Sequence, residues 1–400
     1  MNRRVFLAEM RKIWRPLPLI AALAVFVVGA LFAANQTHLV EGPYRNVDVV
    51  VESAEFGPVY TPETRRAVQT ELEKAKAAFA ADMAADPAAR EQGVTDWDSY
   101  HDWQDRMIAA GGDSSAIDAY ALSSYERVNS LEFLLRYAET DGEQIRATLN
   151  DGVCFVRGFP QGAPCGDVPG AAARRIDQLV AQAGRRSLLG YGVISTIQES
   201  GGTMMVTAVL CAMLLTMFTM TRDRQLRLPS LQWASRTGRS VRSWQAAAVG
   251  CSAALAALTV GTVWAAWLAV RLRPVLGTGI NTALATDMPW FDWTVLQYLV
   301  AYAAVAVLAS LALSLVAAWI VRARQNYIRM LLVAIPVGVA AGCLVKFRIG
   351  AHLGYLANPL NRLLMVPGVE TIALAAILVL AVALWTVDAR LLRRRELPVA

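Results

Sequence analysis

The sequence has little of what most enzymes need. Only three histidines and four lysines occur among its 400 residues, and none of the lysines follows a glycine. An ATP-binding P-loop needs a glycine-rich turn that ends in Gly-Lys-Ser/Thr, so the chain cannot hydrolyse ATP by that route. No HExxH motif is formed, which excludes a zinc protease of that type. We therefore expect no catalytic residue, no metal ligand and no cofactor in this chain.

Charge is also scarce, and acidic residues are absent from the longest apolar runs. Charged residues make up 18% of the chain and hydrophobic residues 56%, with a mean hydropathy of +0.38. A transmembrane helix needs roughly 20 mostly apolar residues. Six runs qualify, none of which contains Asp or Glu: 17–34, 202–221, 245–270, 295–321, 328–345 and 371–387. The sequence therefore predicts an all-α polytopic membrane protein with six transmembrane helices and a mainly helical extracellular domain.

Basic residues near these runs predict the orientation. Eighteen Lys and Arg fall on the side of the two termini, against five in the short loops on the other side. Cytoplasmic loops carry the excess of positive charge, so both termini are expected in the cytoplasm and the protein in the plasma membrane. The sequence pI of about 9.2 then reflects arginines beside the membrane and indicates no nucleic-acid partner.

The first residues allow two interpretations. Residues 1–16 place Phe6, Met10 and Ile13 at helical spacing, with Leu7 and Trp14 beside them. The opposite side of this helix is expected to be charged, with Arg3, Arg4, Glu9, Arg11, Lys12 and Arg15. This predicts an amphipathic helix in the cytoplasmic interface, and a basic flank that only sets topology is the alternative. We read 17–34 as an uncleaved span rather than a signal peptide, because Phe32 stands where a cleavage site needs a small residue.

The segment between the first two spans has the composition of a soluble domain. Residues 35–201 hold 15 basic and 25 acidic residues, a net charge of −10. Helices are expected over 62–85, 97–110 and 123–150, and a fourth from Ala171 towards the second span, after an extended piece at 47–55. Trp97 and Trp103 are read as core aromatics, with a binding site for a cationic peptide or an accessory protein as the alternative.

Two of the five cysteines lie in this outer region. Cys154 and Cys165 bound the turn-rich segment CFVRGFPQGAPC on the oxidising side of the membrane. We predict a disulfide that closes this short loop, with two unpaired thiols as the alternative. Cys211, Cys251 and Cys343 fall within spans, where a lone cysteine is usually a small apolar filler.

Two loops are longer than simple turns require. Residues 222–244 are basic and contain Pro229 and Gly238, which leaves room for a short helix on either side of the glycine. Residues 346–370 are semi-apolar but interrupted by Gly, Asn-Pro and Pro-Gly. Such a segment cannot cross the bilayer, and we expect short helices that dip into the outer leaflet.

Together these features resemble the permease subunit of an ABC-2 type ABC transporter, in the branch with a large extracellular domain between spans 1 and 2. The members of that family carry a connecting helix before span 1, here residues 1–16. They carry a cytoplasmic coupling helix followed by a Gly-Arg signature, here Ser235-Arg236-Thr237-Gly238-Arg239. They also carry re-entrant helices around a Leu-x-Pro-Leu element, matched by 356–360 and its Asn358, Pro359 and Leu360. The acidic residue often found just after span 2 is only approximated, by Asp223.

The resemblance implies a function and partners. Two permease chains, identical or sister, would pair in the lipid bilayer above two copies of a cytosolic ABC ATPase that binds ATP and Mg. The residues expected to couple to that ATPase are Leu231, Trp233, Arg236, Gly238 and Arg239. The cargo would be an exported amphiphile, peptide or drug-like molecule. The alternatives are that these arginines only follow the positive-inside bias, and that the chain is a receptor or regulator whose extracellular domain senses a ligand.

Overall fold

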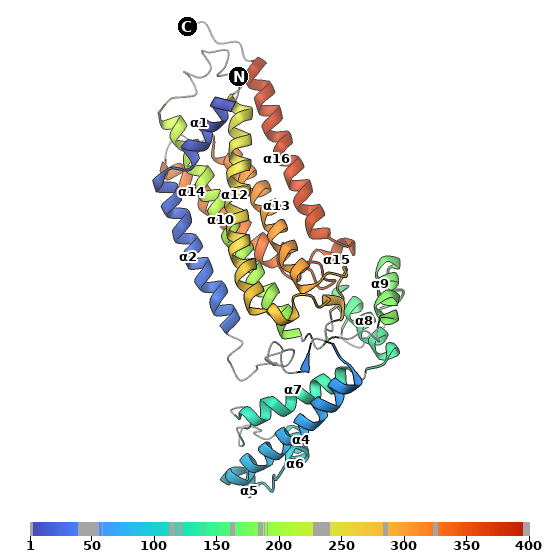
Figure 1. Cartoon of the computed structure of the whole chain (residues 1–400). Coiled ribbons are helices and arrows are strands. Elements are labelled where there is room, and N and C mark those ends of the chain that lie inside the picture. The colour runs from blue at the N-terminus through green and yellow to red at the C-terminus, as the bar shows by residue number, and fades with distance from the viewer. Residues whose placement is uncertain are drawn as a thin grey trace.

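Six long apolar helices form the body of the molecule in this computed structural model (Figure 1). The structure describes residues 3–38, 56–57, 59–111, 117, 119, 122–138, 140–160, 165–182, 187, 189, 191–226, 241–282, 287–322 and 327–394. In these residues the chain is helical apart from turns, loops and three isolated β-bridges. The helices of the body are α2 Pro16–His38, α10 Tyr191–Gln225, α12 Val241–Arg271, α13 Val295–Val321, α14 Tyr327–Leu344 and α16 Val369–Arg394.

These helices confirm that the six predicted apolar runs form long helices, and most extend beyond the predicted limits. Each has a segment that is long and apolar enough to cross a membrane. The largest difference is in α10, which begins at Tyr191 rather than at residue 202, so the predicted boundary of the outer domain at 201 falls inside this helix. The longer helices also include acidic residues near their ends, among them Glu199, Glu370 and Asp388.

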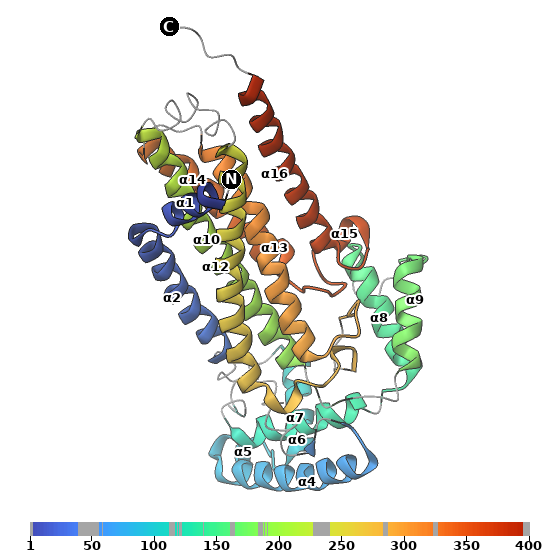
Figure 2. The same cartoon turned by 45° about the horizontal axis from the view of Figure 1, so that its top comes forward.

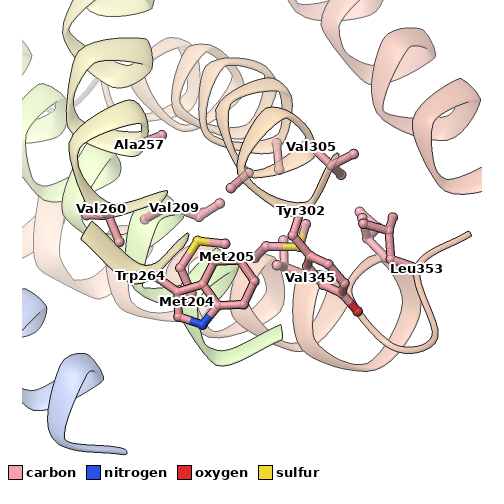
Figure 3. Packing of buried hydrophobic residues seen from close by; sticks show 14 of the residues in the cluster. Met204, Met205, Val209, Ala257, Val260, Trp264, Tyr302, Val305, Val345 and Leu353 are labelled. Carbon is pink, nitrogen blue, oxygen red and sulfur yellow. The ribbon is translucent and has the colours of Figure 1, made fainter. Parts of the chain in front are cut away.

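Helices α10 and α13 lie at the centre of the bundle. Helix α10 packs against α2, α12, α13 and α14, whereas α16 packs mainly against α13. Figure 3 shows part of the core between them, where Met205 and Val209 of α10 meet Trp264 of α12 and Tyr302 of α13. The outer helices α2, α14 and α16 keep much of their apolar surface exposed, as a lipid environment or a second chain requires.

Helix α1 Arg3–Ile13 and the C-terminal end of α16 lie at the same end of the bundle (Figures 1 and 2). An even number of spans places them on one side of the membrane. We call this end the terminus side, and the opposite end, where the helices between α2 and α10 lie, the outer end.

The outer region contains two helical units. The first comprises α4 Pro62–Ala85, α5 Pro87–Glu91, α6 Trp97–Ala109 and α7 Ser123–Ala138. Its core is aromatic: the ring of Phe79 meets those of Trp97 and Tyr100 edge-on, with centroids 5.1 and 5.7 Å away. Trp97 and Trp103 are both 3% exposed, so they are core residues as predicted and offer no ring face to a ligand.

The second unit is the hairpin of α8 Gly142–Val156 and α9 Gly170–Ala181. The single helix predicted over 123–150 is wrong, because α7 ends at Ala138 and a new helix starts at Gly142. Asp141 caps that start by accepting a hydrogen bond of 2.8 Å from the amide of Gln144. The fourth predicted helix also ends early, at Ala181. The extended piece expected at 47–55 lies outside the described residues.

The predicted disulfide is confirmed. Cys154 and Cys165 are bonded, with their Cα atoms 5.3 Å apart. The bond joins the last turn of α8 to the segment before α9, and Arg157 adds a hydrogen bond of 3.0 Å to the carbonyl of Cys165. We expect Cys154→Ser plus Cys165→Ser to cost something under about 3 kcal/mol, the chain-entropy value for so short a loop. Protease sensitivity near α8 measures this effect, and Cys251→Ser, at a free and exposed cysteine, is the control that breaks no disulfide.

Candidate functional site

Helix α1 lies against the terminus-side ends of α10 and α12. Ile13 is 1% exposed, and Phe6 and Met10 pack beside it in the same apolar cluster. The Phe6 ring meets Trp244 of α12 edge-on, with centroids 6.3 Å apart. Trp14 donates from Nε1 to Ser252 Oγ over 3.1 Å while keeping 38% of its surface exposed. The predicted interfacial helix is therefore a folded part of the bundle.

The predicted charged side of α1 is partly wrong, because Glu9 and Lys12 face the protein. Glu9 is only 4% exposed and accepts a hydrogen bond of 2.7 Å from Lys12 Nζ. Lys12 also lies 3.2 Å from Oδ2 of Asp223, near the end of α10. Gln245 of α12 donates to the same Asp223 oxygen over 3.2 Å. We call Glu9, Lys12, Asp223 and Gln245 the α1 cluster.

Burial and the neighbouring charges shift the pKa values of the two ionisable residues that α1 supplies to this cluster. Burial raises the pKa of Glu9 above its ordinary value, and the hydrogen bond and charge of Lys12 only partly oppose this. For Lys12, burial would lower the pKa, but the hydrogen bond and charge of Glu9, with the charge of Asp223, outweigh it and raise the pKa. Lys12 therefore stays charged and holds two carboxylates together, where each would otherwise repel the other.

A second ionic cluster lies at the same end of the bundle. Asp388 of α16 accepts a hydrogen bond from Arg322, which follows α13, and lies 3.5 Å from Nε of Arg242 of α12. The three side chains are only 15–17% exposed. Arg322 also stacks on Trp319, with its guanidinium carbon 4.9 Å from the ring centroid. We call Arg242, Arg322 and Asp388 the Asp388 cluster.

The two clusters flank both ends of the loop that follows α10. Helix α10 ends at Gln225 and α12 begins at Val241, and the bond between Asp223 and Gln245 joins the two helices beside the loop. Arg242 links the clusters, since it also donates to Gln245 Oε1 over 3.4 Å. The predicted coupling residues lie outside the described residues: Leu231, Trp233, Arg236, Gly238 and Arg239.

At the outer end, Asn358 organises the segment after α14. Its side chain is fully buried and donates to the carbonyls of Ile349 and Ala351 over 3.3 and 2.8 Å. Its Oδ1 accepts a hydrogen bond of 3.0 Å from the amide of Leu360, and Pro359 and Leu360 are half-buried. The helices in this segment are short: a π-helical turn at Val345–Ile349 and one α-helical turn, α15 Asn361–Leu364. The depth of this segment in the membrane stays a prediction.

Three residues from the spans fasten this segment to the bundle. Tyr298 and Tyr302 of α13 donate to the carbonyls of Leu353 and Gly350 over 2.9 and 2.8 Å. Glu370, 2% exposed at the start of α16, accepts a hydrogen bond of 2.8 Å from the amide of Gly354. The sequence carries no local signal for these residues, because each side chain bonds a backbone group far away in the chain.

The α8–α9 hairpin docks on the outer loops of the body. Arg175 is 6% exposed, donates from Nε to the carbonyl of Pro289 over 2.8 Å, and lies 2.6 Å from Oδ1 of Asp292. Leu149, Ile176 and Trp290 share the apolar contact beside it. The outer region is therefore attached directly to the loops that cap the spans.

This contact predicts an acid-sensitive attachment. The hydrogen bond from Arg175 holds the pKa of Asp292 below its ordinary value. The ion pair therefore contributes above the ordinary pKa of about 4 and is lost as the pH falls through the lowered value. We expect Arg175→Gln to increase amide exchange in 287–293 and α9 at neutral pH. Arg174→Gln, on the exposed face of α9, is the control, and equal exchange in both variants would contradict the assignment.

The structure defines the class to which the protein belongs. Among the described residues no group of three or more His, Cys, Asp or Glu is placed to hold a metal ion. The chain is an all-α, multi-pass membrane protein with ionic clusters at the terminus side of its bundle. Comparison with family models, with curated proteins and with solved structures finds no match for this chain.

Proposed function

We propose that the chain is the permease subunit of an ABC-2 type transporter, driven by a separate cytosolic ATPase that binds ATP and Mg. The observation that carries the proposal is the α1 cluster. It ties both ends of the basic loop after α10 to a helix that lies across the bundle. A protein that binds and displaces this loop moves α1, α10 and α12 together. The helices stay joined because breaking the buried ion pairs of Lys12 is costly.

The exposed outer helices fit a body that pairs with a second permease. Helix α14 presents Ile328, Leu332, Ile335 and Val339 on one face, each more than 60% exposed. Their spacing of four, three and four residues forms a continuous apolar stripe. An identical or sister chain would cover part of this surface, and lipid the rest. An amphiphile, peptide or drug-like molecule is the proposed cargo of the pair, exported from the cytoplasm.

The second candidate is a receptor or regulator, and the docking of the α8–α9 hairpin favours it. A ligand that moves the hairpin would pull on Asp292, which lies three residues before the start of α13. This mechanism requires an effector protein that binds the loops on the terminus side and responds to their movement. It needs no ATPase, so the same experiment separates the two candidates.

The test is co-purification from mild detergent, comparing the native chain with Gly238→Trp plus Arg239→Glu. We expect a cytosolic ATPase to accompany the native chain and to be lost from the variant. The matched control is Gly277→Trp plus Arg273→Glu, the same changes in an exposed loop at the outer end, where a Cβ on Gly277 meets no atom within 4 Å. If no ATPase accompanies the native chain, the transporter proposal fails and the receptor candidate replaces it.

A further inference from the structure

The tip of the α8–α9 hairpin carries two exposed phenylalanines. Phe155, in the last turn of α8, is 61% exposed, and Phe159, just after that helix, is 37% exposed. The two helices are antiparallel, since Arg146 near the start of α8 lies 2.6 Å from Asp177 near the end of α9. Both rings therefore lie at the end of the hairpin opposite to its connections with α7 and α10.

The backbone at this tip is closely fixed. Gly158, with a positive φ of 92°, ends α8 and donates from its amide to the carbonyl of Phe155 over 2.9 Å. The amide of Phe159 donates to the carbonyl of Cys154 over 3.1 Å, and the two bonds together form a Schellman cap. Arg157 lies over the Phe159 ring, with its guanidinium carbon 5.6 Å from the ring centroid. The rings are therefore held at the surface by an ordered turn.

The tip lies beside the segment that leads into α16. Val168, in the connection between α8 and α9, shares an apolar cluster with Met365, which directly follows α15. Figures 1 and 2 show the hairpin next to α15, level with the outer ends of the spans. In α15, Leu363 and Leu364 are 82% and 62% exposed, and the candidate span of α16 begins at Val369. The two phenylalanines thus lie close to the level at which α16 enters the membrane.

Size and composition favour lipid over a protein partner at this tip. Two phenylalanines bury at most about 500 Å². A stable protein interface buries roughly 800 Å² on each partner, so the two rings are too small to form one. The tip and α15 also expose Arg157 and Arg362 beside their phenylalanines and leucines. Apolar side chains flanked by arginine are typical of protein surfaces that lie among lipid headgroups.

We propose that the tip of the α8–α9 hairpin inserts Phe155 and Phe159 into the membrane leaflet at the outer end of the bundle. The hairpin is then held twice, by Arg175 on the loops that cap the spans and by the two rings in lipid. The proposal goes beyond the transport function and does not depend on it, because it uses only the hairpin and its position beside α16. A second copy of the chain that covers the tip is the competing partner.

Photocrosslinking in a bilayer tests what covers the tip. The full chain is reconstituted in phosphatidylcholine nanodiscs with photoreactive benzoyl-phenylalanine in place of Phe155, and the adducts formed on irradiation are identified by mass spectrometry. We expect at least tenfold more lipid adducts than with the same label at Ile108, which is 62% exposed in α6. The label at Thr148, exposed and seven residues earlier on the same face of α8, should also give few adducts, because it lies about 10 Å farther from the tip.

A charge at the tip supplies the second test. With the label at Phe155, Phe159→Asp should reduce the lipid adducts several-fold, because moving a carboxylate out of water opposes insertion. Phe159→Leu should keep them, since leucine is also apolar and makes the same backbone bond in the cap. The Cys154–Cys165 disulfide, detected in the same mass spectra, shows that the hairpin has formed in each variant.

Three results would overturn the proposal. The first is a yield of lipid adducts at Phe155 no higher than at Ile108 or Thr148, and the second is an unchanged yield in Phe159→Asp. The third is crosslinking of the label at Phe155 to another copy of the chain in place of lipid, which would assign the tip to an interface between copies.

Discussion

Replacement of Lys12 by methionine will lower the thermal midpoint of the protein more than any other single change of charge in α1. Methionine keeps most of the apolar length of the side chain but leaves Glu9 and Asp223 buried without their shared cation. Breaking a buried ion pair from one side typically costs 3–5 kcal/mol, because the remaining charge is left uncompensated. Thermal unfolding in detergent, followed by size-exclusion chromatography, measures the effect.

The control and the rescue make this prediction specific. Arg11→Met removes a neighbouring charge whose side chain is exposed, and it should change the midpoint little. Adding Glu9→Gln and Asp223→Asn to Lys12→Met should restore part of the lost stability, since the cluster then contains no uncompensated charge. If Lys12→Met is as stable as Arg11→Met, Lys12 does not hold the cluster together.

The second large effect is expected at Gly201 in α10, and its neighbour supplies the control. A Cβ on Gly201 would lie 2.7 Å from two ring atoms of Tyr302, whose hydroxyl holds the carbonyl of Gly350. A Cβ on Gly202 would meet its nearest atoms, in the Lys346 side chain, at 3.5 Å, an ordinary contact. Gly201→Ala should therefore displace the buried ring and cost about 1–3 kcal/mol, as overpacking does.

Gly202→Ala should leave the protein unchanged or stabilise it, by up to about 1 kcal/mol, because alanine favours helix. The measurement compares the two thermal midpoints together with amide exchange in 345–356. Equal midpoints, or faster exchange in Gly202→Ala, would contradict the close packing of α10 against α13 and the segment that Tyr302 holds.

The spans were predictable because lipid imposes a simple requirement on length and apolarity. The α1 cluster was harder to predict, since the bond that joins α1 to α10, between Lys12 and Asp223, links residues 211 positions apart. One signal was nevertheless present: Glu9 lies three residues after Phe6 and four before Ile13, on the apolar face of the helix. A charge on that face predicts a buried partner, which is Lys12 and, through it, Asp223.

The candidate site also shows why the end of span 2 was difficult to interpret. From the sequence, Asp223 only approximates the acidic residue that the family places there. In the structure it is 6% exposed and bonds both Lys12 and Gln245. The break between α7 and α8 is hard to predict for a different reason, because the start signal at Asp141-Gly142 lies within a stretch of apolar periodicity.

The central claim is that the loop after α10 faces the cytoplasm, where an ATPase can bind it. Its most direct test labels single cysteines in intact cells with a membrane-impermeant maleimide: Asp105→Cys in α6, Thr237→Cys in the loop and Arg390→Cys in α16, with the parent chain as control. We expect labelling of Asp105→Cys alone in intact cells, and of the other two only after the cells are opened. Labelling of Thr237→Cys in intact cells would place the loop outside and contradict the proposed function.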